Sequence, residues 1–209
     1  MEIVLLRHRK TKGNLEGRYV GSTDEPILLS EAGEERIQIH DFWPEKVFTS
    51  QLLRTVQSAE SFFPGVLIET NRMFEEMDFG EFEYKNYREL QGNQDYQRYI
   101  DSNGTIAFPK GESREQMQKR CIEAFFQCVE KSKSEGRRAI AFVVHGGTIM
   151  SIMNGLYPDS PFFEFQVSCG CGYRIKIEEK KETEENLHED EIKTDWAFIG
   201  TGSSNCMGN

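Results

Sequence analysis

The amino-acid sequence predicts an α/β fold: a mostly parallel central sheet flanked by helices on both faces, in a three-layer sandwich. Two observations predict it. Short apolar runs at residues 3–6, 47–49 and 139–144 have the length of buried strands, and segments with helical patterning lie between them. Strands that alternate with helices along a chain form mostly parallel sheets, and such sheets are covered on both faces.

The elements of the N-terminal half are indicated by their ends. Ser30 is a suitable N-cap for a helix that runs to about Phe42, with glutamates near its positive end. The dipeptide Pro64-Gly65 stops a second helix, which begins near Leu53. The expected order is strand 3–6, helix 30–42, strand 47–49, helix 53–62 and strand 66–68.

The C-terminal half begins with a polar and aromatic segment, about 83–110, which we expect to form a short helix and a lid loop. Ser113 and Gln116 form a capping-box pattern at the start of a long helix. The elements expected after it are strand 139–144, helix 148–156, strand 173–177, charged loop 178–193, and a tail, 195–209, that adds an edge strand or binds a neighbour. The aromatic residues of the lid, which line a site or pack as core, are Tyr84, Tyr87, Tyr96, Tyr99 and Phe108.

Composition and charge narrow the class of protein. The chain has 209 residues, 37% of them hydrophobic, which suffices for a single domain over residues 1–209. The formal net charge of −10 argues against a nucleic-acid partner but leaves a small phosphorylated metabolite open. The apolar run at the N-terminus is too short for a signal peptide or a membrane span. We therefore expect a cytoplasmic monomer or homodimer without a membrane partner.

The five cysteines include no Cys-x-x-Cys pair. Cys121 and Cys128 have helical spacing and are expected in the core, and reduced thiols in a cytoplasm are the favoured interpretation. Cys169 and Cys171 with a histidine are the alternative of a metal-binding protein, but no paired histidine or second cysteine pair supports it. We expect neither a bound metal nor a cofactor.

Two histidines follow directly on predicted strands. His8 comes after Arg7 at the end of the first strand, and His145 comes after strand 139–144. Ligands of parallel sheets bind at the carboxyl ends of the strands, so we expect both histidines at one rim. An ordinary buried histidine at a strand end is the competing interpretation of His145, although Gly146 and Gly147 allow the backbone to approach a ligand closely.

Cationic side chains gather near His8. Arg7, Arg9 and Lys10 would repel one another in a core but suit a place where a dianion binds; a solvated basic loop is the alternative. Arg54, at the start of the helix after the second strand, can bind phosphate oxygens in a bidentate manner beside the helix N-terminus. An ordinary surface position is the alternative for this arginine.

Residues 75–83 mix carboxylates with aromatic rings after the third predicted strand. A carboxyl group held near apolar rings can stay protonated and donate a proton, which is the work of a general acid. An acidic surface loop is the competing interpretation of this segment.

Taken in order, these motifs resemble the histidine phosphatase superfamily, which includes the cofactor-dependent phosphoglycerate mutases. Arg7-His8 with Thr11 and Asn14 is similar to the family signature Arg-His-Gly-x-Thr-x-x-Asn. The other matching segments are Tyr19–Ile27, Ser50–Thr55, Glu76–Glu83, Gly111–Ser113 with Arg120, and His145–Gly147. The resemblance covers about residues 1–177 and implies a phosphoglycerate mutase-like fold.

The resemblance also implies a mechanism without a metal. His8 forms a transient phosphohistidine, cationic groups hold the phosphoryl oxygens, and Glu76 donates a proton to the departing alcohol and then helps water attack. The implied catalytic residues are His8, Glu76, His145, Arg7 and Arg54. The residues implied to bind phosphate or substrate are Arg7, Asn14, Gly21, Ser22, Arg54, His145 and Gly146.

Two departures from the family pattern bear on function. Arg9 stands where the family usually has glycine or another small residue, and we expect it to alter the phosphate pocket or to extend toward the substrate. A non-catalytic phosphate-binding regulatory module is therefore one alternative. Residues 76–80 lack the Arg-His pair of the mutases, which favours a phosphatase over a phosphoglycerate mutase-type phosphotransferase. Among bacterial members, this segment looks most like that of the α-ribazole phosphatases.

Overall fold

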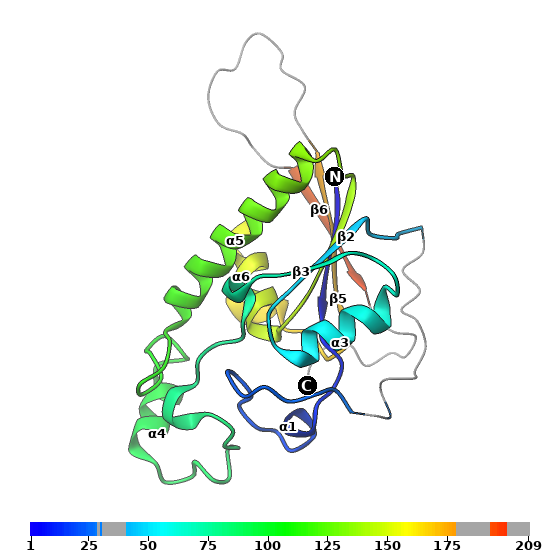
Figure 1. Cartoon of the computed structure of the whole chain (residues 1–209). Coiled ribbons are helices and arrows are strands. Elements are labelled where there is room, and N and C mark those ends of the chain that lie inside the picture. Colours follow the sequence, from blue (N-terminus) through cyan, green and yellow to red (C-terminus); the bar gives the residue numbers. More distant parts are fainter. Residues whose placement is uncertain (29, 31–40, 179–192, 200–209) are drawn as a thin grey trace.

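A six-stranded sheet forms the centre of the protein, in the order β3-β2-β4-β1-β5-β6. The computed structural model describes residues 1–28, 30, 41–178 and 193–199. The first four strands pair in parallel, whereas β5 runs antiparallel to both β1 and β6 (Figure 1), which confirms the mostly parallel sheet. The strands are β1 (Glu2–Arg7), β2 (Lys46–Thr49), β3 (Ile68–Thr70), β4 (Ala139–Val144), β5 (Gly172–Glu178) and β6 (Lys193–Ile199).

Helices cover both faces of the sheet, as the three-layer prediction requires (Figure 1). On one face, Val4 and Leu6 pack with Phe62 of α3. On the other face, Ile3 and Leu5 belong to the larger apolar cluster, which includes residues of α5 and α6. Successive strand residues point to opposite faces, so one short apolar strand supplies both cores. The helices are α1 (Lys12–Leu15), α3 (Leu53–Phe62), α4 (Gln94–Asp101), α5 (Arg114–Ser134) and α6 (Gly146–Leu156), with 3-10 turns η1 (Arg72–Phe74), η2 (Gly80–Phe82) and η3 (Phe162–Phe165).

The starts of β3 and α6 differ from the prediction by two residues, whereas β1, β2 and β5 extend by no more than one residue at either end beyond the predicted strands. α3 and β4 have the predicted bounds. β3 begins at Ile68 rather than Val66, because the turn that Pro64-Gly65 opens continues through Val66, whose N–H bonds back within it. α6 begins earlier than predicted, at Gly146, because His145 adopts the extended backbone of an N-cap residue.

The antiparallel edge follows the predicted alternation. In β5, Tyr173, Ile175 and Ile177 are buried and Lys176 is exposed. β6 forms the edge of the sheet, so the first part of the tail adds an edge strand. Residues 31–40 of the predicted helix, residues 179–192 of the charged loop and the tail from residue 200 lie outside the described residues.

The predicted lid segment lies beyond the carboxyl ends of the parallel strands, with α4 as its short helix (Figure 1). Phe108 and Tyr99 have the expected roles of core or cavity wall, whereas Tyr87 has neither. Phe108 is buried in the core, and Tyr99 packs on it with 4.2 Å between ring centroids. Tyr87 is 60% exposed. Tyr99 also lines a cavity, so it alone of these three belongs to both core and cavity.

Candidate active site

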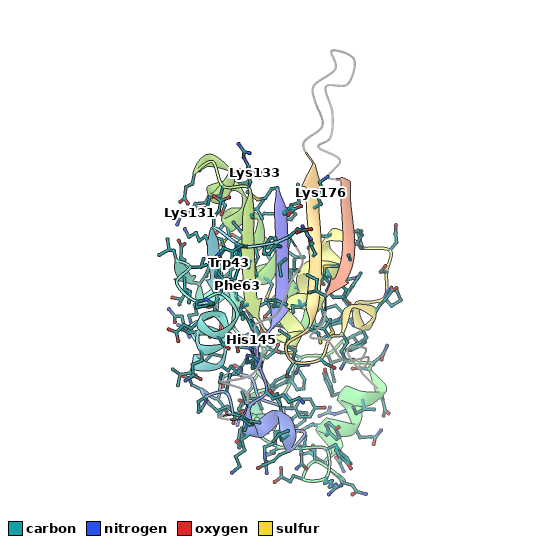
Figure 2. All side chains as sticks on the ribbon, turned by 90° about the vertical axis from the view of Figure 1, so that its right-hand side faces the viewer. Trp43, Phe63, Lys131, Lys133, His145 and Lys176 are labelled. Carbon is teal, nitrogen blue, oxygen red and sulfur yellow. The ribbon has the colours of Figure 1, made fainter. Side chains whose placement is uncertain are left out.

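The two strand-end histidines lie side by side, as predicted. β1 and β4 are neighbours in parallel register, with Arg7 opposite Val144, so the residues that follow each strand share one rim. The ring centroids of His8 and His145 are 5.2 Å apart in an edge-to-face arrangement. Figure 2 shows His145 at the end of the sheet, beyond the strands.

The His8 imidazole is held in one tautomer by a backbone carbonyl. Its Nδ1 lies 2.7 Å from the carbonyl oxygen of Arg9, which can only accept, so Nδ1 carries the hydrogen. Burial first, and then the charges of Arg54 and Arg7, hold the pKa of His8 well below its ordinary value of 6.5. At neutral pH the ring is therefore uncharged, and its lone pair is on Nε2.

His145 is held by two polar partners. Arg54 donates from Nε to its Nδ1 at 3.3 Å, so the hydrogen of a neutral ring is on Nε2 and points to Ser50 Oγ at 2.9 Å. Burial, followed by the charge of Arg54, holds the pKa of His145 well below 6.5. Both ring nitrogens are thus occupied, and His145 orients Arg54 in this arrangement. Sequence reasoning did not find Ser50 as a partner of His145.

Arg54 is fully buried in the first turn of α3, and its guanidinium is hydrogen-bonded to the segment that contains Gly21 and Thr23. Its Nη1 donates to the carbonyl of Thr23 and its Nη2 to the carbonyl of Gly21, each at 2.8 Å. The N–H of Gly21 is itself bonded to the carboxylate of Glu83. Gly21 therefore meets Arg54 through its carbonyl group, rather than presenting a free N–H to a phosphate.

Arg7 carries a buried donor for which the described residues provide no acceptor. Nη1 donates to the carbonyl of Val167 at 2.7 Å, but Nε is buried without a hydrogen-bond partner. Gly146 lies against this guanidinium, since a Cβ at that position would be in ordinary van der Waals contact with Arg7, 3.4 Å from its Cζ. Buried donors are almost always paired, so an anion bound here would complete the bonding of Arg7.

The carboxyl group of Glu76 lies at the N-terminus of α6. Its Oε2 accepts from the N–H of Gly147 at 3.1 Å, and its Oε1 accepts from the N–H of Met77 at 2.9 Å. Position 147 has no room for a side chain, because a Cβ there would lie 2.3 Å from Glu76 Oε1. The helix N-terminus thus holds this carboxyl group beside Arg7 and Gly146, at the wall of a shared cavity.

The other predicted binding residues lie around this centre in two ways. Thr11 is the N-cap of the short helix α1, and Asn14 completes the capping box, with its Oδ1 accepting from the N–H and hydroxyl of Thr11 at 3.2 and 3.0 Å. Ser22 lines a cavity of about 470 Å³ that also touches Glu76 but does not include Arg7. Asn14 therefore has a local structural role, and Ser22 reaches the site only through this second cavity.

Comparison with known proteins fits this geometry. Residues 3–190 match the family model of the histidine phosphatase superfamily (branch 1). The chain belongs to the histidine phosphatase superfamily. Members of this superfamily are phosphatases and mutases, which supports an enzymatic activity for this chain.

Individual relatives within the superfamily have different activities. The chain is 34% identical over 133 residues to human 6-phosphofructo-2-kinase/fructose-2,6-bisphosphatase 4, of which it spans only 26%, with 56% of its own length. It is 26% identical over 205 residues to the adenosylcobalamin/α-ribazole phosphatase of Escherichia coli, covering 86% of this chain and 92% of that protein. The solved structure of α-ribazole phosphatase from Shigella flexneri has a TM-score of 0.72, at 22% identity over 85% of this chain and 91% of that one. This similarity shows that the chain and the Shigella flexneri protein share a fold.

Arg9, the departure from the family pattern, points away from the cavity. It is 4% exposed, and its guanidinium lies over the Phe62 ring at 4.6 Å from the centroid. Its backbone N–H donates to Ser58 Oγ at 2.8 Å. The expectation that Arg9 extends toward the substrate is wrong, because α3 offers a buried aromatic face that holds the guanidinium beneath the site.

A cavity of about 340 Å³ opens beside Arg7, Glu76 and Gly146, and it is the better candidate for the substrate. Sequence reasoning missed most of its walls. The missed wall residues are Tyr19, Phe79, Arg114, Met150, Phe162, Phe163 and Gln166. The aromatic run in η3 was the available signal, but nothing local indicated that it faces Arg7.

The cysteines and carboxylates offer no metal centre within the described residues. No group of three or more His, Cys, Asp or Glu side chains is arranged to hold a metal ion in that part of the chain. Cys121, Cys128 and Cys169 are free, whereas Cys171 is disulfide-bonded, so the expectation of reduced thiols fails at Cys171. Across the described ranges, none of the helices is long and apolar enough to cross a membrane.

Proposed function

We propose that this protein is a phosphatase that hydrolyses a small phosphomonoester through a phosphohistidine on His8. The observation that carries the proposal is the bond from His8 Nδ1 to the carbonyl of Arg9. It keeps the hydrogen on Nδ1 and leaves the lone pair of Nε2 for attack on phosphorus. The Nε of Arg7, which is buried without a partner among the described residues, supports the binding of a phosphoryl oxygen beside it.

In the first step, Nε2 of His8 forms a bond to phosphorus as the bond to the leaving oxygen breaks. Glu76 gives its proton to that oxygen, so the product is a neutral alcohol. Arg7 offsets the charge on the phosphoryl oxygens directly, and Arg54, steadied by His145, adds a second positive charge. Gly146, which lines the cavity of Arg7, and Ser22, which lines the second cavity beside Glu76, complete the set that we propose to surround the phosphate or the substrate.

In the second step, water attacks the phosphohistidine. Glu76, now a carboxylate, takes a proton from the water as the new phosphorus–oxygen bond forms. The bond from phosphorus to Nε2 breaks, and its electrons return to the ring as a lone pair. Inorganic phosphate leaves, and Glu76 and His8 are back in their starting protonation states.

Phosphatase activity is favoured over mutase activity by residues 76–80, which carry Met77 and Asp78 where the mutases have an Arg-His pair. The aromatic walls of the 340 Å³ cavity suit a ring-bearing substrate. α-Ribazole phosphate is the named candidate, because a curated α-ribazole phosphatase aligns over 86% of the chain.

The test is hydrolysis of p-nitrophenyl phosphate by wild type and by His8→Ala, each with and without EDTA. We expect activity in wild type alone, unchanged by EDTA, and a trapped phosphoenzyme that is acid-labile and alkali-stable. Equal background rates from both proteins would favour the non-catalytic binding module. A panel of α-ribazole phosphate, 3-phosphoglycerate and sugar bisphosphates then identifies the substrate. Phosphate transfer within 3-phosphoglycerate instead of release would point to a mutase.

A further inference from the structure

Arg114 occupies an electrostatically unfavourable position. It is the first residue of α5, a helix of 21 residues that Ser113 caps through a bond from the N–H of Gln116. The N-terminus of a helix carries partial positive charge, so carboxylates are favoured there and a cation is not. A guanidinium at this position therefore does not stabilise the helix.

The guanidinium of Arg114 faces the aromatic cavity. Its Cζ lies 5.1 Å from the centroid of the Phe162 ring, and the residue lines the 340 Å³ space together with Arg7. Within the described part of the chain, Arg114 forms neither an ion pair nor a hydrogen bond. Arg18, another cation of the same cavity, differs in this respect, because it pairs with Glu89 at 2.8 Å.

The space between the two arginines is bounded by flat rings. Tyr19 and Phe79 pack together at 5.0 Å between centroids and line one part of it. Gly104 keeps the wall open near Tyr99, because a Cβ there would lie 3.0 Å from the Tyr99 hydroxyl. A volume of about 340 Å³ is at the lower end of the range for small-molecule sites, so it suits a compact ligand with a ring.

From this arrangement we infer that Arg114 is a specificity-determining residue that binds a second anionic group of the substrate. The substrate class is an aromatic or heteroaromatic phosphomonoester that also carries a carboxylate or a second phosphate. The reacting phosphate lies at Arg7, the ring lies between the aromatic walls, and the second anion pairs with Arg114. This inference rests on the proposed phosphatase function and names the substrate class of the same site.

The experiment compares phenyl phosphate with 3- and 4-carboxyphenyl phosphate, which differ only by the added carboxylate. The enzymes are wild type, Arg114→Ala, Arg114→Lys and the control Arg98→Ala, whose side chain is 72% exposed on α4 and lies outside the cavity. We expect wild type and Arg98→Ala to prefer at least one carboxyphenyl ester by roughly tenfold in kcat/KM, the size of one charge-assisted hydrogen bond.

Arg114→Ala should remove this preference, so that its kcat/KM for the carboxyphenyl esters no longer exceeds that for phenyl phosphate, and Arg114→Lys should restore part of it. An equal preference in wild type and Arg114→Ala, or none in wild type, overturns the inference. Should wild type hydrolyse none of the esters, the proposed function fails, and the inference is then decided by calorimetric binding of phenylphosphonate and its carboxyphenyl analogues. Binding of those analogues that does not depend on Arg114 overturns it.

Discussion

His8 donates from Nδ1 to the carbonyl oxygen of Arg9, its neighbour in the chain, at 2.7 Å. A single peptide thus sets which nitrogen of the ring can attack. The same residue sends its side chain back over Phe62, so the group that fixes the tautomer is itself anchored in the core. The proposed nucleophile and the residue that fixes its tautomer are therefore neighbours in the chain, with side chains that point in different directions.

The first prediction concerns activity in acid. The attacking form of His8 is neutral, and its pKa lies well below 6.5. The acid limb of kcat/KM should therefore fall below pH 6.5, whereas an ordinary histidine would already lose half its neutral form there. A pH profile with p-nitrophenyl phosphate, corrected for ionisation of the substrate, measures this. An acid limb centred at or above pH 6.5 contradicts the prediction.

The second prediction concerns stability in acid. His8 and His145 are both neutral when folded because burial lowers each pKa, but in the unfolded chain each returns to about 6.5. Below pH 6.5 the unfolded state binds more protons, so this part of the stability is complete above that pH and declines as the pH falls toward the folded pKa values. Urea denaturation from pH 7.5 to 5 should show the decline, with a shallower slope in His145→Gln. Parallel slopes in the two proteins would exclude His145 as a contributor.

The third prediction concerns Ser50. Replacing it with alanine leaves the buried Nε2–H of His145 without an acceptor, which costs about 1–3 kcal/mol of folding free energy. The freed ring no longer steadies Arg54, so kcat should also fall, roughly tenfold. Ser151→Ala is the matched control, since its buried hydroxyl has no hydrogen-bond partner among the described residues and its loss should cost little. Similar effects of the two substitutions on kcat would show that Ser50 has no special role.

The residues that meet at the rim could be predicted from the sequence, whereas their hydrogen bonds could not. Apolar runs that end in His8 and His145 suffice, because parallel strands end on the same side of a sheet. The partner of each ring nitrogen depends on side-chain packing between distant segments, as Ser50 with His145 shows.

The direction of the Arg9 side chain could not be predicted for the same reason. A cation next to a nucleophile suggests substrate contact, but the Phe62 ring that holds it lies on a helix far along the chain. The role of Arg114 could not be predicted from the sequence, because an arginine at a helix start indicates a binding residue only when the cavity beside it is known.

The fourth prediction uses two glycines of α6. Gly147→Ala should lower kcat at least tenfold, because its Cβ would lie 2.3 Å from Glu76 Oε1 and force the proposed proton donor out of place. Gly155→Ala is the control in the same helix, since its Cβ would meet the flexible end of the Ile122 side chain. Steady-state kinetics and thermal denaturation of both variants separate the effects. Loss of activity in Gly155→Ala alone would argue against the role of Glu76.

The fifth prediction tests the direction of Arg9. Because its guanidinium packs on Phe62 rather than in the cavity, Arg9→Gly, which installs the usual family residue, should leave KM within about twofold of wild type. Folding stability should fall by about 1–3 kcal/mol, since a buried cation–π contact and packing are lost and glycine loosens the loop. Lys10→Ala, at an exposed neighbour, should change neither quantity. Urea denaturation and kinetics with p-nitrophenyl phosphate give both values. A large rise in KM with unchanged stability would contradict this prediction.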